Sequence, residues 1–353
     1  MLMAATGWHE AVGPRHKMKA IYFTGHGEAG LTDLPEPALQ PGHALIDVKA
    51  SGLCHTDIDV LHGRYGSSAF PLVPGHEYAG IVVAVAEDVT NVKVGDRVAV
   101  DPNIPCGYCR ACLKGLTNLC SDLKAYGVTH NGGFASMSLV EASHLHSIGD
   151  LPFNVAALAE PLACVLNGLG AADLKTGPYG TETALVFGAG PIGLLLALSL
   201  KARGVKHVAV ADINEHRLAF AEGLGLEPVV SGSEMLDKPK RSFDFVADAT
   251  GITQVVESMV SYAADGGTVL MFGVCAPEAR ISVAPFEIFR RQIRIAGSHS
   301  LNRNIPQALE ILKQDQGEMA RLVSHQLPLR EMLPHFTKHG GDPATMKVQF
   351  VPD

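Results

Sequence analysis

The pattern of hydrophobic and polar positions changes near residue 161. Before that point, short runs at 44–50, 81–86 and 96–100 alternate apolar and polar residues or are rich in β-branched residues. Such runs are typical of half-buried strands, because side chains of a strand point to alternate faces of a sheet. We therefore expect a β-rich domain of short strands in the first part of the chain.

After Pro161 the pattern predicts strands and helices in alternation. We expect strands at 184–187, 207–211, 243–247, 268–272 and 293–296, and helices at 192–203, 215–224 and 253–263. Such alternation is typical of a doubly wound parallel sheet that is covered by helices on both faces. A helix at 305–313 and a strand at 346–351 follow, and we expect this tail to return to the first domain.

Length and composition agree with a globular α/β protein of two domains. The chain has 353 residues, which exceeds a comfortable single core, and 47% of them are hydrophobic and 18% charged. Residues 1–17 lack the apolar block of a secretory signal, so we expect a poorly ordered leader and a folded chain that begins near Met18. The apolar run at 194–200 is much shorter than a membrane span.

Charge and cysteine content limit the partners and the compartment. A net charge of −8 and a pI near 6.0 disfavour nucleic acid and anionic membranes, which require a basic surface. Small molecules are therefore the expected partners. Four of the seven cysteines lie within residues 106–120, which is an unusual arrangement for disulfides. Metal binding in a reducing cytoplasm is the better interpretation.

Those four cysteines have the spacing C-x2-C-x2-C-x7-C, at Cys106, Cys109, Cys112 and Cys120. Four thiolates that converge on one ion favour a structural zinc with no open coordination position. Iron–sulfur clusters also use four thiolates, but their bacterial motif ends C-x3-C-P, which does not follow Cys112. The sequence therefore predicts a structural zinc here.

A second group of candidate metal ligands is spread along the chain. His76 and Glu77 stand between glycines in the stretch 71–80, which we expect to be a rigid loop, and Cys54 lies 22 residues before His76. Three protein ligands and an open position are typical of a catalytic zinc site. Glu160 is the fourth candidate. Singly, Cys54 could be a small buried residue and Glu160 a helix-start acid; together they favour a metal site.

A glycine-rich turn follows the strand predicted at 184–187. It consists of Gly188, Ala189, Gly190, Pro191, Ile192 and Gly193. Its three glycines suit a tight turn, close approach of a pyrophosphate and helix–strand packing. Asp212 lies 22 residues after Gly190, where a carboxylate binds the adenosine ribose of NAD and repels the 2′-phosphate of NADP. Arg217 is a candidate phosphate contact.

From residue 18 onward, the chain resembles the zinc-dependent medium-chain alcohol dehydrogenase family. The shared motifs, in family order, are Cys54-His-Thr-Asp, Gly75-His-Glu-x-x-Gly80, Gly95-Asp-Arg-Val98, the four cysteines, Gly188-x-Gly-x-x-Gly193 and Asp248-Ala-Thr-Gly251. Glutamate at 160, in Glu-Pro-Leu, is similar to the sorbitol and polyol dehydrogenase branch. The resemblance implies a GroES-like catalytic domain at 18–162 and 304–353 and a Rossmann coenzyme domain at 163–303.

The resemblance also implies roles for individual residues. Cys54 and His76, with either Glu77 or Glu160, hold a catalytic zinc, and the remaining acid lies near the metal-bound water. Thr56 takes the proton of the alcohol. The residues implied in coenzyme binding, besides the glycine turn, are His55, Asp212, Arg217, Thr250, Val274 and Ser298.

The implied reaction is the NAD-dependent oxidation of a secondary hydroxyl of a polyol to a ketose. Zinc lowers the pKa of the alcohol, an alkoxide forms, and hydride passes to the nicotinamide. The family resemblance implies two zinc ions per chain and a homodimer or homotetramer. Alternatives are a butanediol-like or threonine-like alcohol, or a catalytically silent binding protein on the same fold.

Some positions depart from the family pattern. Asp59 stands where many members have a relay histidine, and His62 is a substitute or a loop residue. The position of the substrate arginine of sorbitol dehydrogenase aligns near Ser300, three residues before Arg303. Val60 replaces an aromatic residue. These departures concern the proton route and the identity of the polyol.

Overall fold

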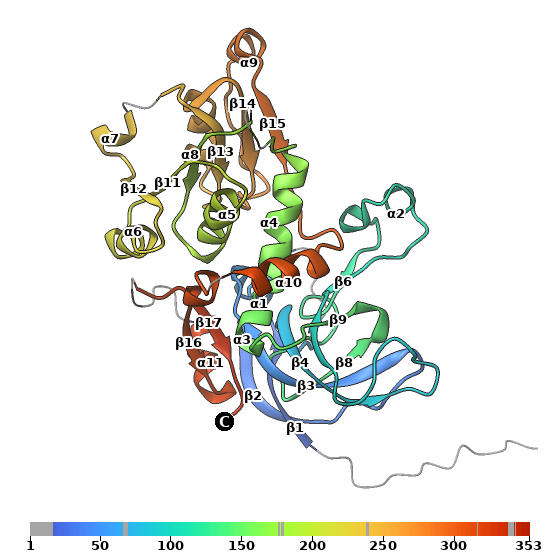
Figure 1. The fold of residues 1–353 in the computed structure, drawn as a ribbon. Coiled ribbons are helices and arrows are strands. Elements are labelled where there is room, and N and C mark those ends of the chain that lie inside the picture. The colour runs from blue at the N-terminus through green and yellow to red at the C-terminus, as the bar shows by residue number, and fades with distance from the viewer. Residues whose placement is uncertain are drawn as a thin grey trace, which may run out of the picture.

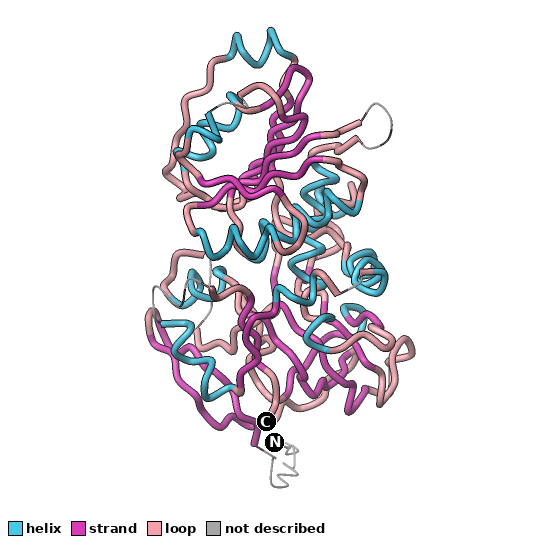
Figure 2. The backbone as a smooth tube through the Cα atoms, turned by 60° about the vertical axis from the view of Figure 1, so that its left-hand side comes forward, coloured by secondary structure: helices cyan, strands magenta, loops and turns pink. Residues whose placement is uncertain are grey.

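The computed structural model describes residues 17–65, 70–175, 177, 180–237, 240–315, 317–337, 342 and 344–353. The chain forms two lobes, each built on its own sheet, and helices lie between and around the sheets (Figures 1 and 2). The predicted leader falls almost entirely outside the described residues. The first strand, β1, begins at Lys17.

The β-rich lobe combines the first part of the chain with its last strands. Its largest sheet has the order β16-β17-β3-β4-β5-β9, with β8 paired to β3. Its strands are β3 (His43–Gly52), β4 (Glu77–Val85), β5 (Arg97–Val100), β8 (Met137–Glu141), β9 (Leu145–Ser147), β16 (Val323–Leu327) and β17 (Lys347–Phe350). The expected return of the tail is confirmed, because β17 pairs with β3.

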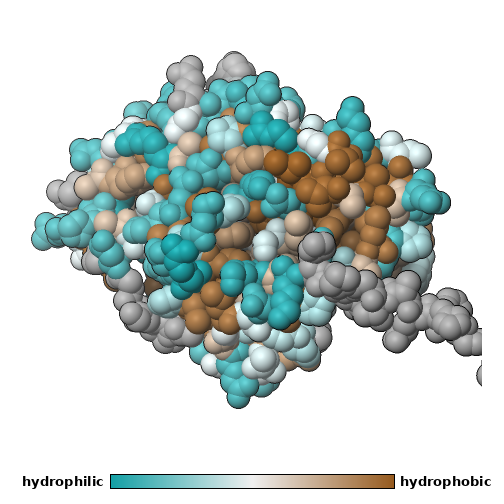
Figure 3. Space-filling model, turned by 90° about the horizontal axis from the view of Figure 1, so that it is seen from below, coloured by the Kyte–Doolittle hydropathy of each residue, from teal (hydrophilic) through white to brown (hydrophobic). Residues whose placement is uncertain are grey.

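Smaller elements complete this lobe. They are the hairpin β1 (Lys17–Gly25) and β2 (Glu28–Pro35), the pair β6 (Asn103–Ile104) and β7 (Lys124–Ala125), and the helices α1 (His55–Leu61), α2 (Arg110–Leu113), α3 (Phe153–Ala156) and α11 (Leu329–Thr337). Short 3-10 turns lie at Thr117–Leu119, Ala142–His144 and Met319–Leu322. Seen from below the view of Figure 1, the surface carries polar side chains around a larger apolar area (Figure 3).

The second sheet is parallel throughout and has the order β12-β11-β10-β13-β14-β15. Its strands are β10 (Thr183–Phe187), β11 (His207–Asp212), β12 (Glu227–Val230), β13 (Phe243–Asp248), β14 (Ala263–Met271) and β15 (Arg294–Gly297). Its helices are α5 (Pro191–Ala202), α6 (Glu215–Glu222), α7 (Glu234–Asp237), α8 (Thr253–Ser258) and α9 (Pro285–Arg291). In sequence order this is 3-2-1-4-5-6, the doubly wound arrangement that binds dinucleotides at the point where the order reverses.

Both faces of this sheet are buried, as the sequence predicted. Val186 on β10 packs into one hydrophobic cluster, and its neighbour Leu185 packs into another on the opposite face. The helix expected at 253–263 is confirmed up to Ser261, because α8 is followed directly by a 3-10 turn at Met259–Ser261, and it is wrong only at its end, where β14 begins at Ala263. There the chain turns early to pair with Phe243, and the register then shifts before the regular ladder.

Helix α4 (Ala159–Ala171) links the lobes and packs against α5 and α10 (Ile305–Gln314) (Figure 1). Among the described residues, Phe153–Ala171 is the one helical stretch long and apolar enough to cross a membrane, and 72% of it is buried inside the protein. Such burial is typical of a core helix. The exact boundaries of the domains, at 162/163 and 303/304, stay a prediction.

Candidate active site and metal sites

Cys54 lies between the end of β3 and the start of α1. The backbone N–H of Leu53 donates to the carbonyl of Val348 on the last strand, which fixes this junction. Asp57, in the first turn of α1, is fully buried, and its Oδ2 accepts a hydrogen bond from the N–H of Cys54 at 2.9 Å. The short helix therefore holds Cys54 through a carboxylate.

Asp57 also fixes the second candidate ligand. Its Oδ1 accepts from the N–H of Gly75 at 3.1 Å and lies 3.3 Å from Nδ1 of His76. Gly75 has a φ of +99°, and an added Cβ would lie 2.6 Å from the ring of Phe134, so only glycine fits there. A carboxylate behind a ligating histidine orients the ring and raises its basicity.

The pKa of His76 is consequently raised well above its ordinary value. Burial by itself lowers this pKa, but the charges of Asp57 and Cys54 outweigh burial. The same negative charges attract a metal cation.

The loop expected at 71–80 is wrong in its last part, because β4 begins at Glu77. Glu77 is 1% exposed. Nζ of Lys347, on β17, donates to Oε1 and Oε2 of Glu77 at 2.8 and 2.7 Å, and to the carbonyl of Leu53 at 3.1 Å. Burial lowers the pKa of Lys347, but the attraction of Glu77 raises it overall. An added Cβ at Gly52 would clash with Oε2 of Glu77, so the backbone also confines this carboxylate.

Glu160 lies in the first turn of α4 and is 8% exposed. Burial raises its pKa to about 7, while His76 opposes that rise and Glu77 adds to it. Sγ of Cys164, one turn later, donates to Oε1 of Glu160 at 3.3 Å. Glu160 is thus a buried acid beside His76 and Glu77 that can hold or release a proton near neutral pH.

The ligand atoms of Cys54, His76 and Glu77 all lie within 4.8 Å of one another. One soft sulfur, one imidazole and one carboxylate form a set that suits zinc. Oγ1 of Thr56 lies 3.6 Å from Sγ of Cys54. His55 is exposed at the rim, 3.7 Å from Asp59.

Nε of Arg64 donates to the same oxygen of Asp59, Oδ1, at 2.8 Å. Arg303 lies near Asp101 and His144: its charge opposes the rise that burial causes in the pKa of Asp101 and adds to the fall in the pKa of His144.

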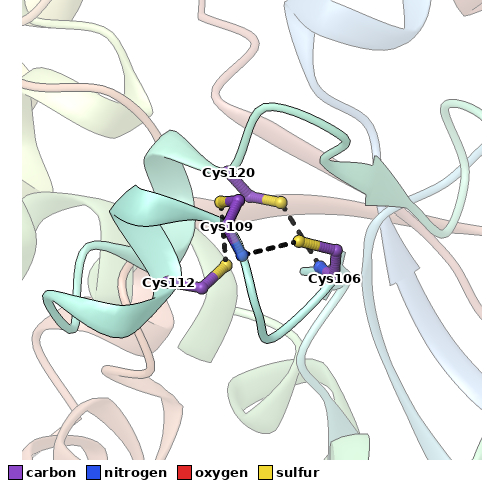
Figure 4. Close-up of side chains that lie close together, drawn as sticks. All are labelled: Cys106, Cys109, Cys112 and Cys120. Atoms are coloured by element: carbon purple, nitrogen blue, oxygen red, sulfur yellow. Dashed lines mark hydrogen bonds between the residues drawn. The ribbon is translucent and has the colours of Figure 1, made fainter.

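Four cysteines converge within residues 106–120, a segment that includes α2 and that we call the four-cysteine lobe (Figure 4). The sulfurs of Cys106, Cys109, Cys112 and Cys120 lie within 4.8 Å of one another. Backbone N–H groups donate to these sulfurs, among them Cys109 to Cys106 at 3.4 Å and Cys106 to Cys120 at 3.3 Å. N–H groups of Cys112 and Ser121 also lower the pKa of Cys109 to about 5. Such donors stabilise thiolates, which a zinc ion requires.

The glycine turn lies between β10 and α5. Gly188 has a φ of +102°, and a Cβ at Gly193 would clash with the carbonyl of Gly188. A Cβ at Gly190 would meet only Nη1 of Arg217, at 3.9 Å, so the space in front of the helix N-terminus is open. Gly190 caps α5 and Pro191 occupies its first turn. This geometry leaves room for an anion at the positive end of the helix.

Asp212 ends β11 beside that turn. Its Oδ2 accepts from the N–H of Ala189 at 2.7 Å and its Oδ1 from the N–H of Asn214 at 2.9 Å. Nε of Arg217 is buried without a hydrogen-bond partner among the described residues. Asp212 and Arg217 thus offer a fixed carboxylate and an available donor next to Gly190.

The remaining coenzyme candidates lie at the carboxyl ends of neighbouring strands. Oγ1 of Thr250 donates to Asp248 at 2.6 Å, just after β13. Val274, after β14, is 83% exposed. The N–H of Ser298, after β15, donates to the carbonyl of Met271. All three residues therefore lie at the carboxyl edge of the parallel sheet, where doubly wound sheets bind their ligands.

Three residues near the candidate ligands Cys54, His76 and Glu77 were missed by the sequence interpretation. Asp57 was present in the Cys54-His-Thr-Asp motif, but no role was given to it. Lys347 had no sequence signal. Tyr65 lies close enough to His76, Cys54 and Glu160 for their charges to affect its pKa, which burial raises. It supplies an aromatic ring near the site although Val60 does not.

The chain matches two family models. Residues 40–150 match the alcohol dehydrogenase GroES-like domain, and residues 191–314 match the zinc-binding dehydrogenase domain. Among characterised proteins, D-altritol 5-dehydrogenase of Agrobacterium fabrum is 69% identical over 94% of this chain and 99% of its own. D-arabinitol dehydrogenase 1 of Uromyces fabae is 32% identical over 89% and 92%.

The fold has a close counterpart among solved structures. A protein from Sinorhizobium meliloti 1021 that is described as a zinc-binding dehydrogenase, crystallised with NADP, superposes with a TM-score of 0.90. It is 29% identical and covers 96% of this chain and 100% of its own. The sequence relatives, both family models and this superposition agree with the resemblance seen in the motifs. The chain belongs to the zinc-dependent medium-chain alcohol dehydrogenase family, in its polyol dehydrogenase-like branch.

Proposed function

We propose that this protein oxidises a secondary hydroxyl of a sugar alcohol to a ketose, with NAD as the hydride acceptor and a hexitol such as D-altritol as substrate. The observation that carries the proposal is the group of Cys54, His76 and Glu77, with the buried acid Glu160 beside it, in a chain 69% identical to a D-altritol 5-dehydrogenase. A silent binding protein has no need for this set of metal ligands.

Two zinc ions per chain are part of the proposal. Cys54, His76 and Glu77 hold the catalytic zinc, and the four cysteines hold the structural one. The catalytic zinc supplies a Lewis acid that lowers the pKa of the substrate hydroxyl. Glu160, the buried acid beside His76 and Glu77, would hold or release a proton next to the metal.

Other residues of the chain orient the ligands, balance charge and transfer the proton. Asp57 orients His76 and Cys54, and Lys347 offsets the charge of Glu77. Thr56 relays the hydroxyl proton: its Oγ1 accepts that proton as it gives up its own, which leaves to solvent. As the C–H bond breaks, its electron pair leaves with the hydride for the nicotinamide and the C–O bond becomes a carbonyl, so the products are ketose, NADH and one proton.

NAD is preferred to NADP in this proposal because Asp212, held beside the glycine turn, is the residue expected to meet the adenosine ribose. A carboxylate repels a 2′-phosphate and accepts from a 2′-hydroxyl. Arg217 favours the opposite preference, since its free Nε could bind that phosphate. Asp212 is the stronger determinant, because two backbone N–H groups hold its charge in place.

The proposal includes a homo-oligomer of two or four chains in the cytoplasm. β15 is an open edge of the six-stranded sheet, and Ile295 on it is 38% exposed. Phe286 and Phe289 on α9 are 67% and 79% exposed. An unpaired strand beside exposed aromatic rings suits a second copy of the chain. Seven unpaired cysteines suit a reducing compartment.

The test is a screen of NADH formation, by absorbance, over hexitols and pentitols that include D-altritol. We expect turnover with at least one hexitol, an NAD rate above the NADP rate, and loss of turnover in Cys54→Ser. Cys54→Ser should still bind NADH. Absence of activity on every polyol in the wild-type protein would refute the proposed function.

A further inference from the structure

The segment 298–304 connects β15 to α10 and so carries the chain from the coenzyme sheet back to the other lobe. One side of it is held by α4. Nδ2 of Asn167 donates to the carbonyls of Ser300 at 2.8 Å and His299 at 3.2 Å. The same helix carries Glu160 in its first turn, so α4 contacts both segment 298–304 and the surroundings of the candidate catalytic metal site.

The other side of the segment is held by the four-cysteine lobe. Oδ1 of Asn302 accepts from the N–H of Thr117 at 3.1 Å and from its Oγ1–H at 2.8 Å, and Nδ2 of Asn302 donates to the carbonyl of Gly115 at 2.9 Å. Nδ2 of Asn118 donates to the carbonyl of His299 at 2.7 Å. We call these five residues the clasp.

All three lobe residues of the clasp lie between Cys112 and Cys120. A metal held by these two cysteines fixes both ends of that seven-residue gap, and with it the groups that reach segment 298–304. Thr117 and Asn118 are 3% and 6% exposed, so water cannot easily replace their partners. The geometry of the cysteine lobe is thereby transmitted to the segment.

The segment needs such support because its backbone is strained. Ser300 and Arg303 have φ values of +54° and +60°, which non-glycine residues adopt at a cost in free energy. Nδ2 of Asn103 adds bonds to Oγ of Ser300 and the carbonyl of Leu301. Such conformations persist only where the surroundings hold them.

We propose that Asn302 and Asn118 are positioning residues that couple the four-cysteine lobe to the coenzyme site through segment 298–304. The segment begins at Ser298, whose N–H bonds to the end of β14 and whose Oγ lies 3.4 Å from Nδ2 of Asn167. Releasing the clasp allows Ser298 to leave the edge where the nicotinamide binds. The inference rests on the proposed coenzyme function of that edge.

The test is a calorimetric titration of NADH into the full-length protein and its variants. Asn302→Ala should raise Kd for NADH about 5- to 20-fold, within the usual range of coupling between sites. Asn302→Asp keeps the acceptor for Thr117 but loses the donor to the carbonyl of Gly115, so its Kd should lie between those of the wild-type protein and Asn302→Ala. The matched control is Asn91→Ala, which loses a 2.7 Å bond to the carbonyl of Ala142 outside the clasp and should leave Kd unchanged.

A double-mutant cycle identifies the route of the coupling. Cys109→Ser breaks the lobe, which is checked by loss of one zinc in metal analysis. If the lobe acts through the clasp, Cys109→Ser and Asn302→Ala together should weaken NADH binding little more than either alone. Fully additive effects, or a Kd unchanged in Asn302→Ala, would overturn the inference. Failure of the wild-type protein to bind NADH would instead overturn the proposed function.

Discussion

Lys347→Met provides a sharp test of the buried charge pair behind the metal cluster. Nζ of Lys347 lies 2.7 Å from Oε2 of Glu77, and the two side chains are 7% and 1% exposed. At 2.7 Å and an effective dielectric constant of about 20, their Coulomb attraction is about 6 kcal/mol. Desolvation offsets part of this, and removing one partner of a buried pair typically costs about 3–5 kcal/mol. We expect Lys347→Met to reduce the free energy of unfolding by that amount.

The measurement is urea unfolding, accompanied by zinc analysis so that loss of metal is not counted as loss of the ion pair. Lys347→Arg keeps the charge and should recover much of the stability. The matched control is Lys206→Met, because Lys206 pairs with Glu182 at the same 2.7 Å while the two side chains are 65% and 51% exposed. This surface pair should contribute less than about 1 kcal/mol. Equal losses in Lys347→Met and Lys206→Met would refute the reasoning from burial.

Three further predictions concern His76, Asp212 and the buried Asp101. His76→Ala should abolish turnover and remove one of two zinc ions while NADH still binds; near-normal rates would exclude His76 as a ligand. Asp212→Ser should lower the ratio of NAD to NADP rates by about tenfold or more, since it removes charged hydrogen bonds to the ribose; an unchanged ratio would contradict this role. Burial raises the pKa of Asp101 from 3.8 to about 6, so its contribution to stability is present below about pH 4 and lost as pH rises through about 6. Asp101→Asn should therefore stabilise the protein at pH 8 by up to about 3 kcal/mol and have little effect at pH 4, as measured by urea unfolding; equal effects at both pH values would disprove the linkage.

Much of the fold could be predicted because its signals are local. The strand of residues 183–187, the glycine turn and the helix that begins at Pro191 follow each other within twenty residues, and each has its own sequence signature. The end of the helix expected at 253–263 was wrong for the opposite reason. After the 3-10 turn at Met259–Ser261, pairing of Ala263 with Phe243 in a neighbouring strand prevailed over the local helical pattern.

The sequence alone determined which residues could bind metal and coenzyme, because the spacing of the four cysteines, the Gly-His-Glu tripeptide and the distance from Gly190 to Asp212 are properties of short segments. Only the tertiary structure decided how Glu77 is neutralised. Lys347 stands 270 residues later, and it reaches Glu77 because β17 enters the sheet beside β3, which in turn pairs with β4. Local patterns specify side-chain chemistry and periodicity, whereas the partner of a buried charge depends on which distant strands lie side by side.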